Sequence, residues 1–167
     1  MKKYLITVVC LILAILLLSG CNNQKSSAEN MLVNAYMAVI DDILYIEDPG
    51  LNHDIKIIAL DTTQMNNLLE EEKAALLAQI SEKYGLTVLD STYDELMAQG
   101  LIDEENLYFT EGILVTIEHP VYDEATQCLS YGISKWRSGL GAYGSDDATA
   151  QYKNGIWQIE KKNSWIS

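Results

Sequence analysis

The feature that most constrains the fold is a change in the spacing of apolar residues near residue 103. Before it, two long stretches carry apolar side chains every three or four positions, which is typical of amphipathic helices. After residue 106 apolar and polar side chains alternate, as Ile113, Val115 and Ile117 show, which is typical of antiparallel strands with one wetter face. The sequence therefore predicts an α+β fold.

The order of elements follows from these periods and from local stop signals. Pro49 and Gly50 end the first helix, Gly85 ends the second, and Thr92 with Glu95 matches the capping box of a third. We expect an N-terminal helix, a strand-helix-strand-helix section and an antiparallel meander. The predicted helices span 30–47, 70–83 and 93–99; the predicted strands span 54–60, 87–89, 113–118, 127–136, 149–153 and 156–161.

The meander is expected to end in a tight hairpin at Asn154-Gly155. A two-residue Asn-Gly loop is the strongest short-range hairpin signal, and it fixes the register of the flanking strands. Lys153 should face Ile156, and Tyr152 should face Trp157. Turn chemistry and hydrophobic pattern then agree.

The N-terminus has a different character from the rest of the chain. Lys2 and Lys3 precede an uncharged apolar run over residues 4–18, which is shorter than the ~20 residues of a bilayer-spanning helix. Ser19 and Gly20 are small, and Cys21 follows them. An uncleaved membrane helix and an ordinary secretory peptide with an incidental cysteine are the alternatives.

Leu18-Ser19-Gly20-Cys21 resembles the lipobox of bacterial lipoprotein precursors. The resemblance implies a signal peptide over 1–20, cleavage before Cys21, and lipidation of Cys21 with acyl chains such as palmitate. Residues 21–29 would be the lipidated cysteine and a flexible tether, and 30–167 a single globular domain. The expected location is the extracytoplasmic face of the cell membrane, with the membrane as a partner through the lipid anchor.

The chain is strongly acidic. Its net charge is −13, and without Lys2 and Lys3 the remaining 9 basic and 24 acidic side chains give −15. Such a domain is repelled by nucleic acid, so no nucleic-acid partner is expected. Once Cys10 leaves with the signal peptide and Cys21 is lipidated, Cys128 has no partner for an intramolecular disulfide.

A basic and aromatic cluster stands out against this acidic background. Lys135, Trp136 and Arg137 precede a predicted glycine-rich loop over 139–144, which contains Tyr143. These four residues are the candidate contacts for a protein partner or a small anionic ligand. The alternative is structural, with Arg137 in a salt bridge to the acidic helical part and Trp136 in the core.

The loop also spells GxGxxG, but no helix follows it and Asp146 and Asp147 would repel a pyrophosphate. We therefore expect its glycines to supply positive φ, and we predict no cofactor. His53 and His119 lack partners at the spacing of metal ligands, so no metal site is predicted from them.

Two carboxylates form the second candidate site. Asp61 and Asp90 each follow a predicted strand and precede a predicted helix, so parallel strands would bring both to one sheet edge. Paired acids can divide acid and base roles or hold a metal. The alternative is that each residue only caps a turn.

Two further resemblances concern the mature part. Tyr152-Lys153-Asn154-Gly155-Ile156-Trp157-Gln158-Ile159 resembles the last hairpin of NTF2-like and cystatin-like exported domains, although the order of elements departs from theirs. The mature chain also resembles uncharacterised small lipoproteins of Gram-positive bacteria. The sequence therefore favours a membrane-anchored binding or accessory module over the alternative, a hydrolase or metal-dependent enzyme using Asp61 and Asp90.

Overall fold

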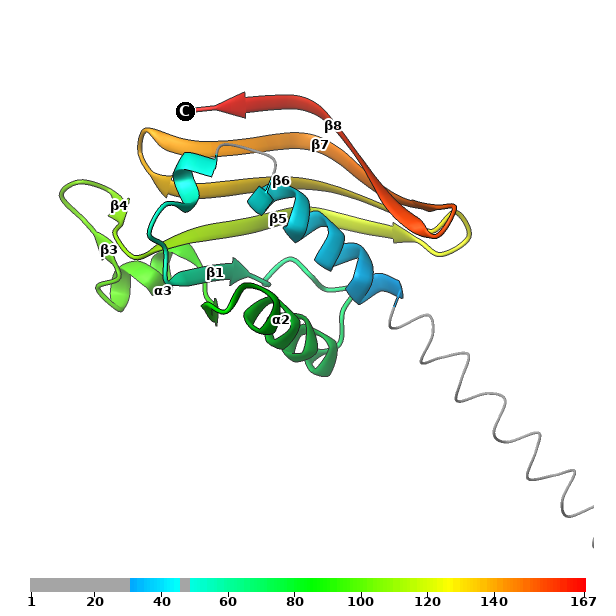
Figure 1. Ribbon diagram of the computed structural model, residues 1–167, viewed down its shortest axis with the longest axis horizontal. Helices are drawn as coiled ribbons and strands as arrows, with labels where there is room; N and C mark the ends of the chain where they lie inside the picture. Colours follow the sequence, from blue (N-terminus) through cyan, green and yellow to red (C-terminus); the bar gives the residue numbers. More distant parts are fainter. Residues whose placement is uncertain (1–30, 46–48) are drawn as a thin grey trace, which may run out of the picture. The chain divides into compact units, whose positions relative to one another are not determined.

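The computed structural model describes residues 31–45 and 49–167, and residues Val33–Ser167 form one compact unit. The predicted signal peptide, Cys21 and the tether lie outside the described residues. The fold is α+β, as the sequence predicts: three α-helices in the described residues accompany an eight-stranded, mostly antiparallel sheet (Figure 1). No helix in the described part of the chain has the length and apolar character needed to cross a bilayer.

The first helix covers residues 31–45. The elements after it are η1 (Pro49–Asn52), β1 (Ile57–Asp61), α2 (Glu70–Tyr84), β2 (Thr87–Asp90), α3 (Tyr93–Ala98), β3 (Ile102–Asp103), β4 (Tyr108–Phe109), β5 (Gly112–Asp123), β6 (Cys128–Ser138), β7 (Gly141–Lys153) and β8 (Ile156–Ile166).

The sheet combines a parallel part with an antiparallel meander. Its strands lie in the order β2-β1-β5-β6-β7-β8, and β4 of the short β3–β4 hairpin pairs with the end of β6. β1 pairs in parallel with β2 and with β5, whereas β5 to β8 pair antiparallel in succession. The parallel contact between β1 and β5 and the β3–β4 hairpin were not part of the sequence prediction.

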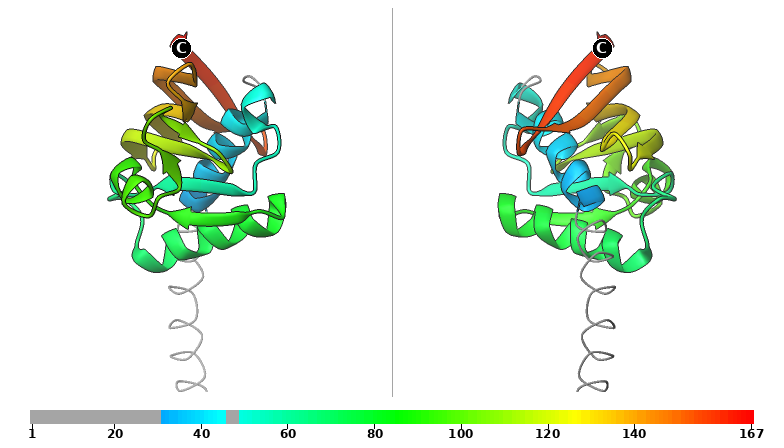
Figure 2. Two further views of the ribbon diagram at one scale, coloured as in Figure 1. Left: turned by 90° about the vertical axis from the view of Figure 1, so that its left-hand side faces the viewer. Right: turned by 90° about the vertical axis from the view of Figure 1, so that its right-hand side faces the viewer.

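Helices cover both faces of the sheet, because successive strand residues point to opposite sides. Ala59 of β1 and Leu114 of β5 are buried with Leu96 of α3 on one face. Ile58, the neighbour of Ala59, lies near the ends of helix 31–45 and α2 on the other face. Figure 2 shows helix 31–45 lying between β8 and α2.

Two adjacent acids tie helix 31–45 to its neighbours. Asp41 Oδ2 lies 2.5 Å from Lys83 Nζ at the end of α2, and Asp42 Oδ2 lies 2.6 Å from Lys161 Nζ of β8. The opposite side of this helix is fully buried, as Tyr36, Val39, Ile40 and Ile43 show. The helix is thus held by an apolar stripe and by ion pairs at its margins.

The helix ends follow the local signals. Thr92 Oγ1 accepts a hydrogen bond from the Glu95 amide at 3.3 Å, and Glu95 Oε2 accepts one from the Thr92 amide at 2.9 Å, which confirms the capping box. These hydrogen bonds lower the pKa of Glu95. Gly85 caps α2 in the left-handed region with φ 66°, as the sequence predicts.

The register of the last hairpin is also the predicted one. Lys153 faces Ile156, and Tyr152 faces Trp157 with ring centroids 5.2 Å apart. Asn154 and Gly155 have φ of 53° and 85°, the positive values that a tight primed turn requires.

The predicted glycine-rich loop over 139–144 is wrong, because β7 already begins at Gly141. None of the three glycines in this stretch has positive φ. Gly144 instead lies beneath the indole of Trp165, where a Cβ atom would overlap the ring. Close packing of β8 on β7, and not turn geometry, is the reason for this glycine.

Candidate functional site

The four predicted contact residues lie on β6 and β7, mostly inside the protein. Lys135, Arg137 and Tyr143 are buried. Trp136 is half-buried and packs edge-to-face on Tyr93 with ring centroids 5.1 Å apart. The structure thus gives these side chains internal contacts, and their contact with a ligand stays a prediction.

Arg137 is 8% exposed and binds backbone carbonyl groups. One terminal nitrogen donates to the carbonyl oxygens of Leu51 at 2.9 Å and His53 at 2.6 Å, and the other donates to Thr110 at 3.2 Å. Its guanidinium also lies 5.3 Å from the centre of the Tyr108 ring. Arg137 therefore clamps the segment around η1 onto the sheet, and within residues 31–45 and 49–167 it forms hydrogen bonds to carbonyl groups in place of the salt bridge that the structural alternative proposed.

Lys135 is fully buried and contacts the same segment. Its Nζ donates to Oδ1 of Asn52 at 3.3 Å, and Nδ2 of Asn52 donates to the carbonyl oxygen of Leu44. The ammonium group thus helps to hold η1 against the end of helix 31–45. Tyr143, on the next strand, donates its hydroxyl to Ser164 at 3.1 Å.

Asp61 and Asp90 lie at the ends of neighbouring parallel strands, as predicted. Oδ1 of Asp61 accepts a hydrogen bond from the Thr63 amide at 2.9 Å, which is an Asx-turn contact. The carboxylate oxygens of Asp90 lie 2.8 and 2.9 Å from the Thr62 hydroxyl. The Asp61 contact matches the turn alternative, whereas Asp90 binds a side chain at the end of the neighbouring strand and does not cap the turn that follows it.

A metal site at this edge would need further ligands. Within residues 31–45 and 49–167, no three His, Cys, Asp or Glu side chains gather as metal ligands do. Asp61 and Asp90 therefore remain a predicted pair without a third ligand in the described chain.

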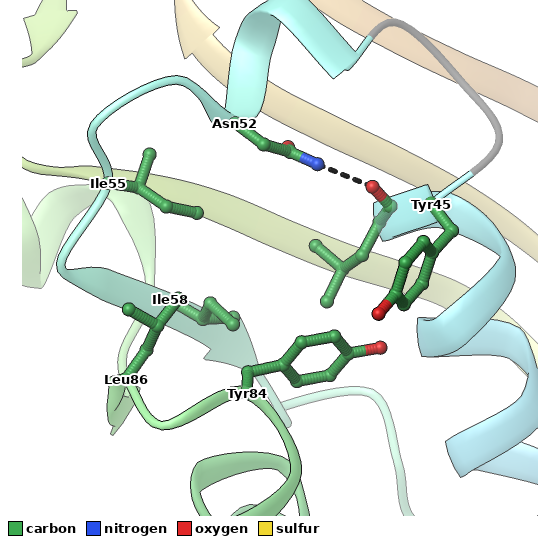
Figure 3. Close-up of a pocket in the computed structure, with 7 residues that line it drawn as sticks. Tyr45, Asn52, Ile55, Ile58, Tyr84 and Leu86 are labelled. Atoms are coloured by element: carbon green, nitrogen blue, oxygen red, sulfur yellow. Dashed lines mark hydrogen bonds between the residues drawn. The ribbon is translucent and has the colours of Figure 1, made fainter.

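A pocket with a mainly apolar lining lies on the helix 31–45 face of the sheet (Figure 3). Its volume is about 380 Å³, within the range of small-molecule sites. The end of helix 31–45, residues 52–55, β1 and the end of α2 form its walls. The lining residues are Leu44, Tyr45, Asn52, Ile55, Ile58, Tyr84 and Leu86.

Two tyrosines form the most chemically distinctive wall. The rings of Tyr45 and Tyr84 lie side by side in Figure 3, with centroids 6.1 Å apart and planes tilted by 41°. The Tyr84 hydroxyl donates to Oδ1 of Asp41 at 2.6 Å. Burial, with the hydrogen bond and charge of Asp41, raises the pKa of Tyr84 far above its usual value. The phenol is therefore neutral at physiological pH.

Tyr45 is more exposed to solvent than Tyr84. It is 69% exposed, and within the described residues the ring contact with Tyr84 is its only recorded polar or aromatic interaction. The other lining side chains are aliphatic, except for Asn52. The pocket can therefore bind an apolar molecule.

Sequence reasoning missed this pocket because four separate segments build it. One signal was available: Tyr45 falls outside the apolar stripe of its helix, which places an aromatic side chain on the solvent side. No known protein family matches the chain, and comparison with curated proteins and solved structures found no similar protein.

Proposed function

We propose that this chain is an extracytoplasmic binding protein, attached to the membrane by lipid on Cys21, whose ligand site is the pocket beside Tyr45 and Tyr84. The anchor rests on Lys2 and Lys3, the uncharged run over 4–18 and the small residues before Cys21. A lipid-bearing N-terminus would keep the domain close to the membrane surface, since the tether before residue 30 is short.

The observation that carries the binding role is the pocket itself. Its walls come from the ends of two helices, from β1 and from the segment that Lys135 and Arg137 hold in place. Such walls preorganise a site, which lowers the entropy that a ligand must lose on binding. A lining of aliphatic side chains, two tyrosine rings and one amide favours binding of a small molecule.

The anchor is tested by growing cells with an alkyne-tagged fatty acid. Wild-type protein and the Cys128→Ser variant should both carry the tag, because Cys128 lies in β6 and is not the acylated thiol. Cys21→Ser should carry none. A tag that persists in Cys21→Ser contradicts the proposed anchor.

The binding role is tested by filling the pocket. Ile55 is half-buried in the lining, so Ile55→Trp should occupy the space without disturbing the fully buried core. Leu140→Trp is the matched control, because Leu140 is exposed in the turn between β6 and β7. Ligand-observed NMR with small apolar compounds, on protein in lipid nanodiscs, should show binding to wild type and Leu140→Trp only. Equal binding to Ile55→Trp would overturn the proposed site.

A further inference from the structure

We infer that the pocket selects an uncharged, flat ring compound about the size of two fused rings. This inference rests on the proposed function, because it names the ligand class of the same site. It differs from the anionic ligand suggested by Lys135 and Arg137 in the sequence. The argument uses the volume of the pocket, the nature of its walls and the pairing of the charges around it.

The volume sets the size of the ligand. An apolar cavity of about 150 Å³ in another protein accommodates benzene. The present pocket, at about 380 Å³, is more than twice as large and is open to solvent at Tyr45. A fused two-ring compound therefore fits.

The walls set the shape of the ligand. Ile55, Ile58 and Leu86 present aliphatic surface, and Figure 3 shows them across the hollow from the two tyrosine rings. The 6.1 Å between the rings of Tyr45 and Tyr84 lies within the range of favourable aromatic pairs. A flat guest ring extends this pair at one side and rests on aliphatic surface at the other.

The charges nearest the pocket already have partners. Asp41 binds Lys83 and the Tyr84 hydroxyl, while Lys135 binds Asn52. A charged ligand would lose hydration without gaining a free counter-charge from these groups. An uncharged ligand avoids this cost.

The same holds for the segment that flanks Ile55. Lys56 pairs with Glu111, and Asp54, whose side chain is 83% exposed, is not part of the lining. The described residues next to the lining therefore leave no free positive charge that would favour an anionic ligand. Asn52 is engaged with Leu44, whereas Tyr45 is 69% exposed and its hydroxyl bonds to no other group among residues 31–45 and 49–167, so it can contact one polar group of the ligand.

Three matched probes test this selectivity. 5-Fluoroindole is neutral, 5-fluoroindole-3-acetate is an anion and 5-fluorotryptamine is a cation at pH 7, so they share one ring system and differ in charge. Fluorine NMR titrations use the protein as cells produce it, in lipid nanodiscs, with empty nanodiscs measured to subtract partitioning into lipid. About 0.5 M salt screens the attraction of the acidic domain for the cation. We expect 5-fluoroindole to bind at least tenfold more tightly than either charged probe.

The variants distinguish the inference on ligand charge from the proposed location of the binding site. Ile55→Trp should abolish saturable binding of 5-fluoroindole, Leu140→Trp should leave it unchanged, and Tyr45→Ala should weaken it severalfold. If a charged probe binds wild type as tightly as 5-fluoroindole and Ile55→Trp abolishes that binding, the inference on ligand charge is overturned while the binding site stands. If no probe binds above the empty nanodiscs, the inference and the proposed binding site both fail.

Discussion

Replacing Arg137 with alanine should destabilise the fold strongly, because its guanidinium is a structural clamp. The side chain is 8% exposed and donates hydrogen bonds to the carbonyl oxygens of Leu51, His53 and Thr110. Arg137→Ala would leave these three acceptors without that partner and would open a cavity beneath η1. The interpretation of Arg137 as an accessible ligand contact predicts a small loss of stability instead.

The expected magnitude follows from these contacts. Each buried acceptor left unpaired costs about 1–3 kcal/mol, but losses at one residue are not additive and water can enter the gap. Nε of Arg137 is buried without a hydrogen-bond partner among the residues that the structure describes, which already lowers the net contribution of the wild-type side chain. We therefore expect Arg137→Ala to lower the free energy of unfolding by about 3 kcal/mol, out of a typical total of about 5–15 kcal/mol.

Urea denaturation followed by tryptophan fluorescence measures this loss. Arg137→Lys keeps the charge but has one ammonium in place of a planar fork, so it should recover about half of the stability. Lys153→Ala is the matched control at an exposed position of β7 and should change the free energy of unfolding by less than about 0.5 kcal/mol. A loss below about 1 kcal/mol for Arg137→Ala would refute the clamp and restore the ligand-contact interpretation.

Three further changes test other parts of the fold. Gly144→Ala should destabilise it by about 1–3 kcal/mol, measured by urea denaturation, because the new methyl group overlaps the Trp165 indole; a neutral effect would show that β8 can shift away. Thr92→Ala should cost about 1 kcal/mol through loss of the cap on α3, and unchanged amide exchange in this helix would contradict that role. Burial raises the pKa of Tyr36, Tyr84 and Tyr131 above the usual 10.0, so the folded state keeps three protons that the unfolded state releases. The free energy of unfolding should therefore fall by up to about 4 kcal/mol per pH unit once the pH exceeds 10, and denaturation curves that do not change between pH 9 and 11 would refute this.

The features that the sequence predicted well have causes within a few residues. Thr92 caps α3, which begins at the next residue, and Gly85 ends α2. Asn154 with Gly155 sets the register of β7 and β8. Such local causes are visible in the order of residues alone. The general α+β class follows as well, since hydrophobic spacing reports helices and strands directly.

The features that the sequence did not predict depend on distant contacts. The parallel pairing of Ile57 with Gly112 joins segments more than fifty residues apart, and no local signal specifies it. A charged residue on a strand is normally expected to face water. Lys135 and Arg137 are buried because the side-chain amide of Asn52 and the carbonyl group of Leu51 bind them. These distant partners could not be identified from the sequence. Gly144 was assigned to a loop because its actual neighbour, Trp165, lies on the next strand.

The pocket shows the same limitation in the candidate site. Tyr45 and Tyr84 lie in different helices, and Ile58 joins them only after β1 has entered the sheet. The sequence drew attention to Arg137 because it is the single arginine of the chain, yet the fold uses it internally. Rarity of a residue type thus did not distinguish a structural clamp from a binding contact.

Photo-crosslinking in intact cells tests the central claim most directly. A small, uncharged aromatic diazirine would be activated by light, and the labelled residues of the protein would be mapped by mass spectrometry. We predict labelling at Tyr45, Tyr84 and Leu86, lost in Ile55→Trp and retained in Leu140→Trp. Labelling that avoids these residues, or that is the same in Ile55→Trp, would contradict the claim that this pocket is the ligand site.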